Sequence, residues 1–170
     1  DNPMQLPDEL DGIYHTPIWG AASDRFRAEI RRHMQAWTIS QFLHGEQAAL
    51  ICAAKIVQQA PDLDAKFYAA TQVVDEARHV EVFKAYLSKF EIAYPMTKPL
   101  QGLIEGALSD ERWDMTYLAM QVVIEGLALA SFANIRTFSK NRLTQQVNAF
   151  VMQDEARHVG FGRIALADYY

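Results

Sequence analysis

The residues best suited to chemistry lie in two copies of one six-residue motif. Asp-Glu-Ala-Arg-His-Val occupies residues 75–80 and returns unchanged at residues 154–159. Each copy contains a Glu-x-x-His pair, Glu76 with His79 and Glu155 with His158. Side chains three residues apart lie on one face of a helix, so each pair can direct a carboxylate and an imidazole at one point. The motif therefore indicates metal binding from two helices.

Two further glutamates extend the repeat. Glu46 precedes Glu76 by the same interval as Glu125 precedes Glu155, so each motif has one lone Glu at a matched position. Two divalent ions would balance four carboxylates and two neutral imidazoles, and this mixture of ligands suits Fe(II) or Mn(II). Six protein ligands leave positions on two metals open to O2, water or substrate. The predicted ligands, which also form the predicted catalytic centre, are Glu46, Glu76, His79, Glu125, Glu155 and His158.

Four long helices would position these side chains. Their periodicity, N-cap signals and turns predict helices over about residues 24–60, 63–90, 110–139 and 143–170. Ser23 is the first N-cap, and Pro61-Asp62 and Lys140-Asn141 are the turns within two hairpins. Glycine beside each lone Glu, at Gly45 and Gly126, would permit either a local helix bulge or simple close packing.

The spacing around each turn supports this arrangement. Pro61 lies midway between Glu46 and Glu76, and Lys140 lies midway between Glu125 and Glu155. In an antiparallel helix pair, equal counts from the turn mean equal height, here roughly 22 Å along the axis. The ligands of each hairpin would therefore face one another in the middle of the bundle.

The connection between the second and third helices is unusually long. Residues 91–109 contain Pro95 and Pro99 and predict a crossover with one short helix at about residues 100–108. A crossover of this length makes the second and third helices parallel, as in ferritin-like bundles. The predicted fold is an all-α, ferritin-like four-helix bundle at residues 23–170, with an internal repeat (42–90 and 121–169), preceded by an irregular segment at residues 1–22.

A second set of side chains would support the predicted ligands. Asp75 and Asp154 lie four residues before the two histidines and can accept the remaining imidazole N–H. Whether each serves its own histidine or that of the other repeat stays open. Arg78 and Arg157 can hold these aspartates. Apolar residues near the ligands would either line a pocket for substrate or O2 or simply form core: Phe42, Leu50, Phe83, Leu129 and Phe132.

Composition limits the partners and the cellular location that the protein can have. The 170 residues are 50% hydrophobic and carry a net charge of -5, which predicts no nucleic-acid partner. Cys52 is the only cysteine, so a disulfide framework and a cysteine-rich iron site are excluded and a reducing, cytoplasmic location is expected. Residues 1–10 show no signal peptide. The apolar run at residues 117–135 is interrupted by Gln121, Glu125 and Asn134, which favours a core helix rather than a membrane span.

These motifs resemble the ferritin-like di-metal carboxylate superfamily over about residues 24–170. Residues 75–79 resemble the Asp-Glu-x-Arg-His motifs of bacterial multicomponent monooxygenase hydroxylases and the related motif of arylamine N-oxygenases, and residues 44–47 resemble the Gly-Glu-Gln of aldehyde-deformylating oxygenases. The sequence also departs from these branches. Leu129 replaces a Thr of the hydroxylases, Val151 replaces the seventh ligand, a His, of the N-oxygenases, and Phe83 replaces the radical Tyr of ribonucleotide reductase small subunits.

The resemblance implies a non-haem di-iron oxygenase or oxidase that activates O2 and oxidises a small, largely hydrophobic organic substrate. Two Fe ions are expected, with Mn as the alternative at one or both positions. Electrons would come from an external ferredoxin or reductase, because no flavin or NAD motif is present in the sequence. The alternatives are a bacterioferritin-type ferroxidase, a manganese catalase and a radical-generating subunit. Association into a homodimer is left open.

Overall fold

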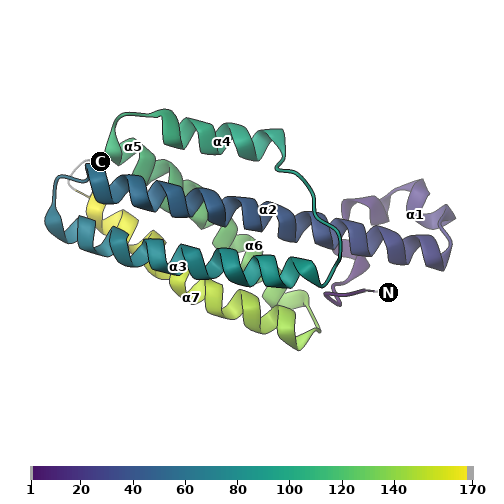
Figure 1. Cartoon of the computed structure of the whole chain (residues 1–170). Helices are drawn as coiled ribbons and strands as arrows, with labels where there is room; N and C mark the ends of the chain where they lie inside the picture. The colour runs from purple at the N-terminus through teal and green to yellow at the C-terminus, as the bar shows by residue number, and fades with distance from the viewer. Residues whose placement is uncertain (1, 168–170) are drawn as a thin grey trace.

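The computed structural model describes residues 2–167, and within them every regular element is helical. Four long helical stretches form the bundle (Figure 1). They are α2 (Asp24–Gln59), α3 (Leu63–Ser88), a continuous stretch made of α5 (Trp113–Tyr117), the π-helical segment η3 (Leu118–Ile124) and α6 (Glu125–Phe138), and α7 (Arg142–Leu166). The all-α, ferritin-like prediction is confirmed.

Three of the four long helices begin where the capping signals predict, whereas the third long stretch begins at Trp113 and not at residue 110. The Ser23 side chain accepts a hydrogen bond from the Phe26 N–H, and Asp62 accepts one from Ala65. Asn141 caps α7 by accepting from Leu143 and Thr144. Each cap satisfies N–H groups that have no partner within the first turn. The chain therefore forms two antiparallel hairpins, α2 with α3 and α6 with α7 (Figure 1).

A crossover joins the two hairpins. After α3 the chain passes along the outside of the bundle, and α4 (Lys98–Ser109) lies beside α2 (Figure 1). Lys55 of α2 fixes the far end of this connection, because its ammonium donates to the carbonyls of Leu108 and Asp110 and to Thr116 Oγ1. As a result α3 and α6 run in the same direction, as predicted.

The N-terminal segment is more ordered than the predicted irregular segment. It contains two 3₁₀ turns, η1 (Asp8–Leu10) and η2 (Gly12–His15), and the short helix α1 (Pro17–Ala21). Met4 is fully buried, its N–H donates to Gln35 of α2, and its carbonyl accepts from Ser139 after α6. These contacts with distant residues fix the segment against the bundle.

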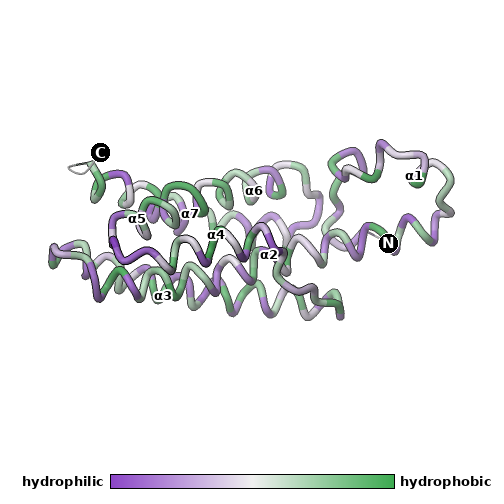
Figure 2. Tube along the Cα trace, turned by 90° about the horizontal axis from the view of Figure 1, so that it is seen from above, coloured by the Kyte–Doolittle hydropathy of each residue, from purple (hydrophilic) through white to green (hydrophobic). Residues whose placement is uncertain are grey.

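The core follows the inward faces of the four long stretches, with hydrophobic and hydrophilic residues alternating along them (Figure 2). One cluster contains the stacked rings of Phe83 and Phe132, which Phe42 also contacts, together with Tyr86 and Val151. A second cluster joins Cys52 of α2 to Ile104 of α4 and Met120 of η3. The crossover helix therefore contributes to the core.

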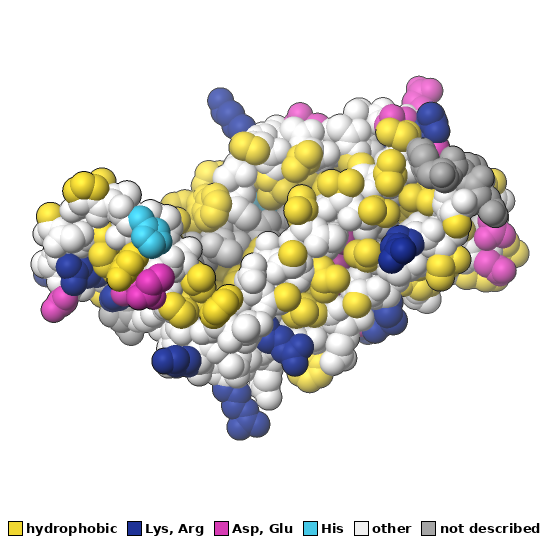
Figure 3. Space-filling view, turned by 180° about the vertical axis from the view of Figure 1, so that it is seen from behind, with side chains coloured by type: hydrophobic (Ala, Val, Ile, Leu, Met, Phe, Trp, Pro, Cys, Tyr) yellow, Lys and Arg dark blue, Asp and Glu magenta, His cyan; other side chains and the backbone are white. Residues whose placement is uncertain are grey.

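One stretch has the length and composition of a membrane-spanning helix. It comprises residues Trp113–Phe138, and 28% of its most apolar window is buried. Its buried polar residues Gln121 and Glu125 face the interior of the bundle. Hydrophobic side chains are widely spread over the face seen from behind, and Lys and Arg are dispersed there (Figure 3). That the protein has no membrane span and binds no nucleic acid remains a prediction.

Gly162 permits a close approach of α7 to η3, and its replacement tests that approach. A Cβ atom at Gly162 would lie 2.7 Å from Gln121 Cβ, whereas one at Gly160 would meet nothing within 4 Å. We expect Gly162→Ala to lower the free energy of unfolding by about 1–3 kcal/mol through overpacking. The matched Gly160→Ala should raise it by up to about 1 kcal/mol through helix propensity. Chemical denaturation of both variants measures this difference, and equal stabilities would contradict the packing argument.

Candidate metal centre

The six predicted ligands converge in the middle of the bundle. Two of the carboxylates reach both imidazoles. Glu76 lies 3.3 Å from His79 Nδ1 through Oε2 and 3.2 Å from His158 Nδ1 through Oε1. Glu155 lies 3.0 Å from His79 Nδ1 and 3.7 Å from His158 Nδ1. Glu76 therefore lies between the two imidazoles and belongs to the surroundings of both, whereas Glu155 lies nearer to His79.

The other two carboxylates each reach one imidazole. Glu46 lies 3.2 Å from His79 Nδ1, and Glu125 lies 3.8 Å from His158 Nδ1. The donor atoms form two groups in which all ligand atoms lie within 4.8 Å of one another. One group is Glu46, Glu76, His79 and Glu155, and the other is Glu76, Glu125 and His158. The structure thus brings all six predicted residues together in a cluster that could bind metal.

The donor atoms of the cluster are better satisfied by metal ions than by contacts among themselves. All six residues are buried. Glu76 Oε2, Glu125 Oε2, Glu155 Oε1 and His158 Nδ1 have no hydrogen-bond partner in the described part of the chain. Buried polar atoms without partners are costly, and four carboxylates in an apolar core repel one another. Divalent cations would remove both costs.

The aspartates of the repeated motif pair with the histidine of the other repeat. His79 Nε2 lies 3.1 Å from Asp154, and His158 Nε2 lies 3.3 Å from Asp75. Each Nε2–H can donate to a carboxylate, which leaves Nδ1 as the ligand atom. This crossing resolves the alternative that the sequence left open. Arg78 contacts Asp75 and Arg157 contacts Asp154, so the predicted network of two aspartates and two arginines is present.

The two halves of the site differ in backbone. The π-helical segment η3 ends directly before Glu125, and Gly126 follows it. The equivalent stretch of α2 before Glu46 is regular α-helix, although Gly45 lies there. A π segment inserts a residue into the helix and changes the direction of the side chains that follow, and such segments occur often at functional sites. Of the two alternatives left open for Gly45 and Gly126, a bulge is therefore found in the second repeat and not in the first.

Two glutamines complete the site and were not predicted. Gln72 is fully buried and donates to both Glu76 and Glu125 at 3.0 and 2.8 Å. Gln121 of η3 in turn donates to Gln72. Gln72 lies seven residues before His79, which is the position of Val151 relative to His158. Val151 packs in the aromatic cluster, so this position carries a polar side chain toward the site in one repeat only.

Electrostatics show how the cluster holds protons without metal. Burial raises the pKa of Glu46 and of Glu125 well above the usual value, and the neighbouring carboxylates of Glu155 and Glu76 add to this. Burial also opposes the ionised form of Glu76, but its close pairing with the imidazoles of His158 and His79 outweighs burial and lowers its pKa to about 2. Both imidazoles show the converse. Burial disfavours their charge, yet pairing with the nearby glutamate carboxylates raises the pKa of His158 to about 11 and that of His79 further.

Metal binding should therefore release protons. The raised pKa values favour the charged, doubly protonated form of both imidazoles at pH 7 without metal, and a metal ion needs the neutral form. We expect about two protons, one from each imidazole, to be released when the site fills, and any proton on Glu46 or Glu125 adds to this number. The apparent metal affinity should rise with pH over the range between neutrality and the raised imidazole pKa values. Calorimetric titrations in buffers of different ionisation enthalpy measure the proton count, and metal uptake without proton release would contradict this electrostatic description.

An inner cavity of about 290 Å³ leads to the cluster. It lies between α2, α4 and α6, and the carboxylates of Glu46, Glu125 and Glu155 form part of its wall. Of the predicted pocket residues, Phe42 and Phe132 line it. Phe83 is buried behind these two rings, and Leu50 and Leu129 line neither described cavity. The lining residues that the sequence did not predict include small ones beside the lone glutamates: Gly45, Ala49 and Ala128.

A helical bundle with two buried carboxylate and imidazole groups that share Glu76 defines a class, the di-metal carboxylate proteins. Residues 1–170 match the family model of P-aminobenzoate N-oxygenase AurF, and the chain belongs to this family. It is therefore an enzyme, an oxidoreductase of the oxygenase type, and the predicted resemblance to arylamine N-oxygenases is confirmed. No curated protein and no solved structure gives a significant match.

Proposed function

We propose that the six clustered side chains hold two iron ions and that the enzyme oxidises the nitrogen of an organic amine with O2. The inner cavity carries this proposal, because it brings a route for an organic molecule to three carboxylates of the cluster. The family supports the nature of the reaction, since its description names an N-oxygenase. Membership of this family favours an oxygenase over a ferroxidase, a manganese catalase or a radical-generating subunit.

The distances suggest a role for each ligand. Glu46, Glu155 and His79 would hold one ion and Glu125 and His158 the other, with Glu76 within reach of both imidazoles. The iron pair, when bound, supplies the redox chemistry that activates O2. Manganese suits the same ligands, so metal analysis of the purified protein must separate the two metals.

The other residues of the site would orient and shield it. Asp154 and Asp75 accept from the Nε2–H groups of His79 and His158 and so fix the planes of both rings. Phe42 and Phe132 line the cavity with apolar surface and exclude water from the reacting nitrogen. Gln72 holds Glu76 and Glu125 in place.

The reaction needs an external source of electrons. An amine R–NH2 with O2, two electrons and two protons gives R–NHOH and water. One oxygen atom forms the N–O bond, and the other leaves as water. The sequence contains no flavin or NAD motif, so a separate ferredoxin or reductase would provide the electrons. We also propose that the enzyme is located in the cytoplasm.

The test starts from metal-free protein loaded with Fe(II) under anaerobic conditions, with about two ions per chain expected. Aniline, a chemical reductant and ¹⁸O2 are then added, and the products are examined by mass spectrometry. One ¹⁸O atom in phenylhydroxylamine supports the proposal. Oxidation of iron with growing mineral and no labelled product would instead indicate a ferroxidase.

A further inference from the structure

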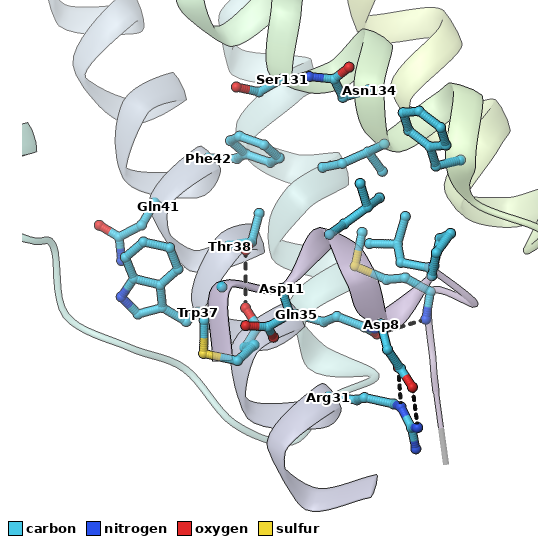
Figure 4. Close-up of a pocket in the computed structure, with 18 of the residues that line it drawn as sticks. Asp8, Asp11, Arg31, Gln35, Trp37, Thr38, Gln41, Phe42, Ser131 and Asn134 are labelled. Carbon is cyan, nitrogen blue, oxygen red and sulfur yellow. Dashed lines mark hydrogen bonds and ion pairs between the residues drawn. The ribbon is translucent and has the colours of Figure 1, made fainter. Parts of the chain in front are cut away.

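A second cavity adjoins the inner one. This outer cavity has a volume of about 640 Å³ and lies between the N-terminal segment, α2 and α6. The two cavities share Trp37, Gln41, Phe42 and Ser131 in their walls. Figure 4 shows Phe42, Ser131 and Asn134 at one end of the outer cavity and the Asp8–Arg31 pair at the other. The two cavities are therefore neighbours along α2 and α6.

The N-terminal wall of the outer cavity is firmly attached. Arg31 of α2 donates two hydrogen bonds of 2.6 Å to the carboxylate of Asp8. Asn141 donates to the carbonyl of Pro3 at 2.8 Å, in addition to the contacts of Met4 with Gln35 and Ser139. The attachments join residues far apart in the sequence, so they hold the space open as part of the fold.

The charges in this space disfavour an anion. Arg31 is the only Lys, Arg or His among the described residues that line either cavity. Its guanidinium is already engaged, because it pairs with Asp8 and lies over the ring of Trp19 at 5.2 Å. Asp11 adds a carboxylate to the outer cavity. A carboxylate on a bound molecule would find no free cation here and would lie near the carboxylates of Asp8 and Asp11.

We propose that the substrate is an elongated, largely apolar amine without an anionic group, whose reacting end lies in the inner cavity and whose body lies in the outer one. This inference rests on the proposed function and specifies the substrate class of the same site. Glu46 lies eight positions after Thr38 on α2, which corresponds to a rise of roughly 12 Å along the helix axis. Two linked aromatic rings span this distance, while a single ring fills the inner cavity alone.

The test compares binding of three probes to the Fe(II)-loaded protein under anaerobic conditions: aniline, 4-aminobiphenyl and 4′-aminobiphenyl-4-carboxylate. Quenching of tryptophan fluorescence reports binding without turnover, since Trp19 and Trp37 line the outer cavity. We expect 4-aminobiphenyl to bind at least about tenfold more tightly than aniline, because its second ring is buried. The carboxylate should bind at least about tenfold more weakly than 4-aminobiphenyl.

Two matched variants locate the second ring. Thr38 lines the outer cavity and donates to a carbonyl four residues earlier, as Thr137 does on α6 outside both cavities. Thr38→Trp should weaken binding of 4-aminobiphenyl about tenfold or more and that of aniline less than about twofold. Thr137→Trp should change neither. Met34→Trp, which also fills the outer cavity, replaces Thr38→Trp if that variant does not fold.

The outcomes separate this inference from the proposed function. Equal binding of all three probes, or equal effects of Thr38→Trp and Thr137→Trp on 4-aminobiphenyl, would overturn the substrate class. Oxidation of aniline would be unaffected by that result. Conversely, probe binding as expected with no labelled product would leave the outer cavity as a binding site and reject the N-oxygenase proposal.

Discussion

Glu125→Gln is expected to leave the metal-free protein folded while removing one of two metal ions and the oxygenase activity. Burial and the neighbouring carboxylates raise the pKa of Glu125, so its uncharged form is favoured without metal. Glutamine has the same shape, and its amide oxygen can accept the hydrogen bond that Gln72 donates to Glu125 at 2.8 Å. The melting temperature of the metal-free variant should therefore stay close to that of the wild type.

The metal-loaded state should respond differently. Glu125 is one of the three residues in the group that contains His158, and an amide is a weaker, uncharged ligand. Loss of a residue that only supports a ligand costs about 10–100-fold in metal affinity, so loss of a ligand should cost at least about 100-fold. Metal catalysis is worth several kcal/mol, so we expect activity to fall about 1000-fold or more.

Iron analysis after anaerobic loading and gel filtration measures this effect, with about one ion per chain expected for Glu125→Gln and about two for the wild type. Glu81→Gln is the matched control, because Glu81 is exposed on α3. Retention of two ions and of activity by Glu125→Gln would show that this carboxylate is not a ligand. A fall in the melting temperature of the metal-free variant would indicate a structural role.

The repeated ligand site could be predicted from the sequence because it depends only on the number of residues between each ligand and the turn of its hairpin. The caps at Ser23, Asp62 and Asn141 determine where three helices begin, and each hairpin then places its glutamates at equal height whatever the details of packing. Convergence of the six side chains follows from these local rules. The crossover followed from its length alone, although α4 begins at Lys98, two residues before the predicted start.

Other features depend on how the helices are rotated about their axes. The pairing of Asp75 with His158 and of Asp154 with His79 requires α3 and α7 to face one another, which no spacing within one helix determines. The π segment before Glu125 depends on packing as well, since Gln121 lies against Gly162 of α7. The order of the N-terminal segment comes from contacts of Met4 with Gln35 and Ser139, which are distant in the sequence. None of these contacts has a local signal.

The cavities show why large apolar side chains are a poor guide to a pocket. Leu50 and Leu129 are hydrophobic and near the ligands in sequence, yet they line neither cavity. Space opens instead where side chains are small. Ala49 and Ala128 each follow a lone glutamate by three residues and both line the inner cavity, as does Gly45. Small residues near a predicted ligand, such as Gly45, Ala49 and Ala128, were therefore the sequence signal for the inner cavity.

A second large effect is expected from the replacement of Gly45, which lines the inner cavity. Ile124 occupies the equivalent position in the other repeat, directly before the lone glutamate, and both residues line the inner cavity. A Cβ atom at Gly45 would meet nothing within 4 Å, and the space that Gly45 lines is the inner cavity, so a larger side chain there would point into that cavity. Glycine within a helix costs up to about 1 kcal/mol relative to alanine. Gly45→Leu should therefore fold at least as stably as the wild type while narrowing the route to the cluster.

We expect Gly45→Leu to keep about two iron ions per chain and to lose amine oxidation by about 100-fold, the typical effect of misplacing a substrate by about 1 Å. Gly45→Ala should lie between the wild type and Gly45→Leu. Gly126→Leu is the matched control, since Gly126 also adjoins a ligand, has open space around its Cβ position and lines neither cavity. Activities are compared at equal iron content. Equal activity in Gly45→Leu and Gly126→Leu would mean that the substrate reaches the metal ions by another route, because only the first variant places a side chain in the inner cavity.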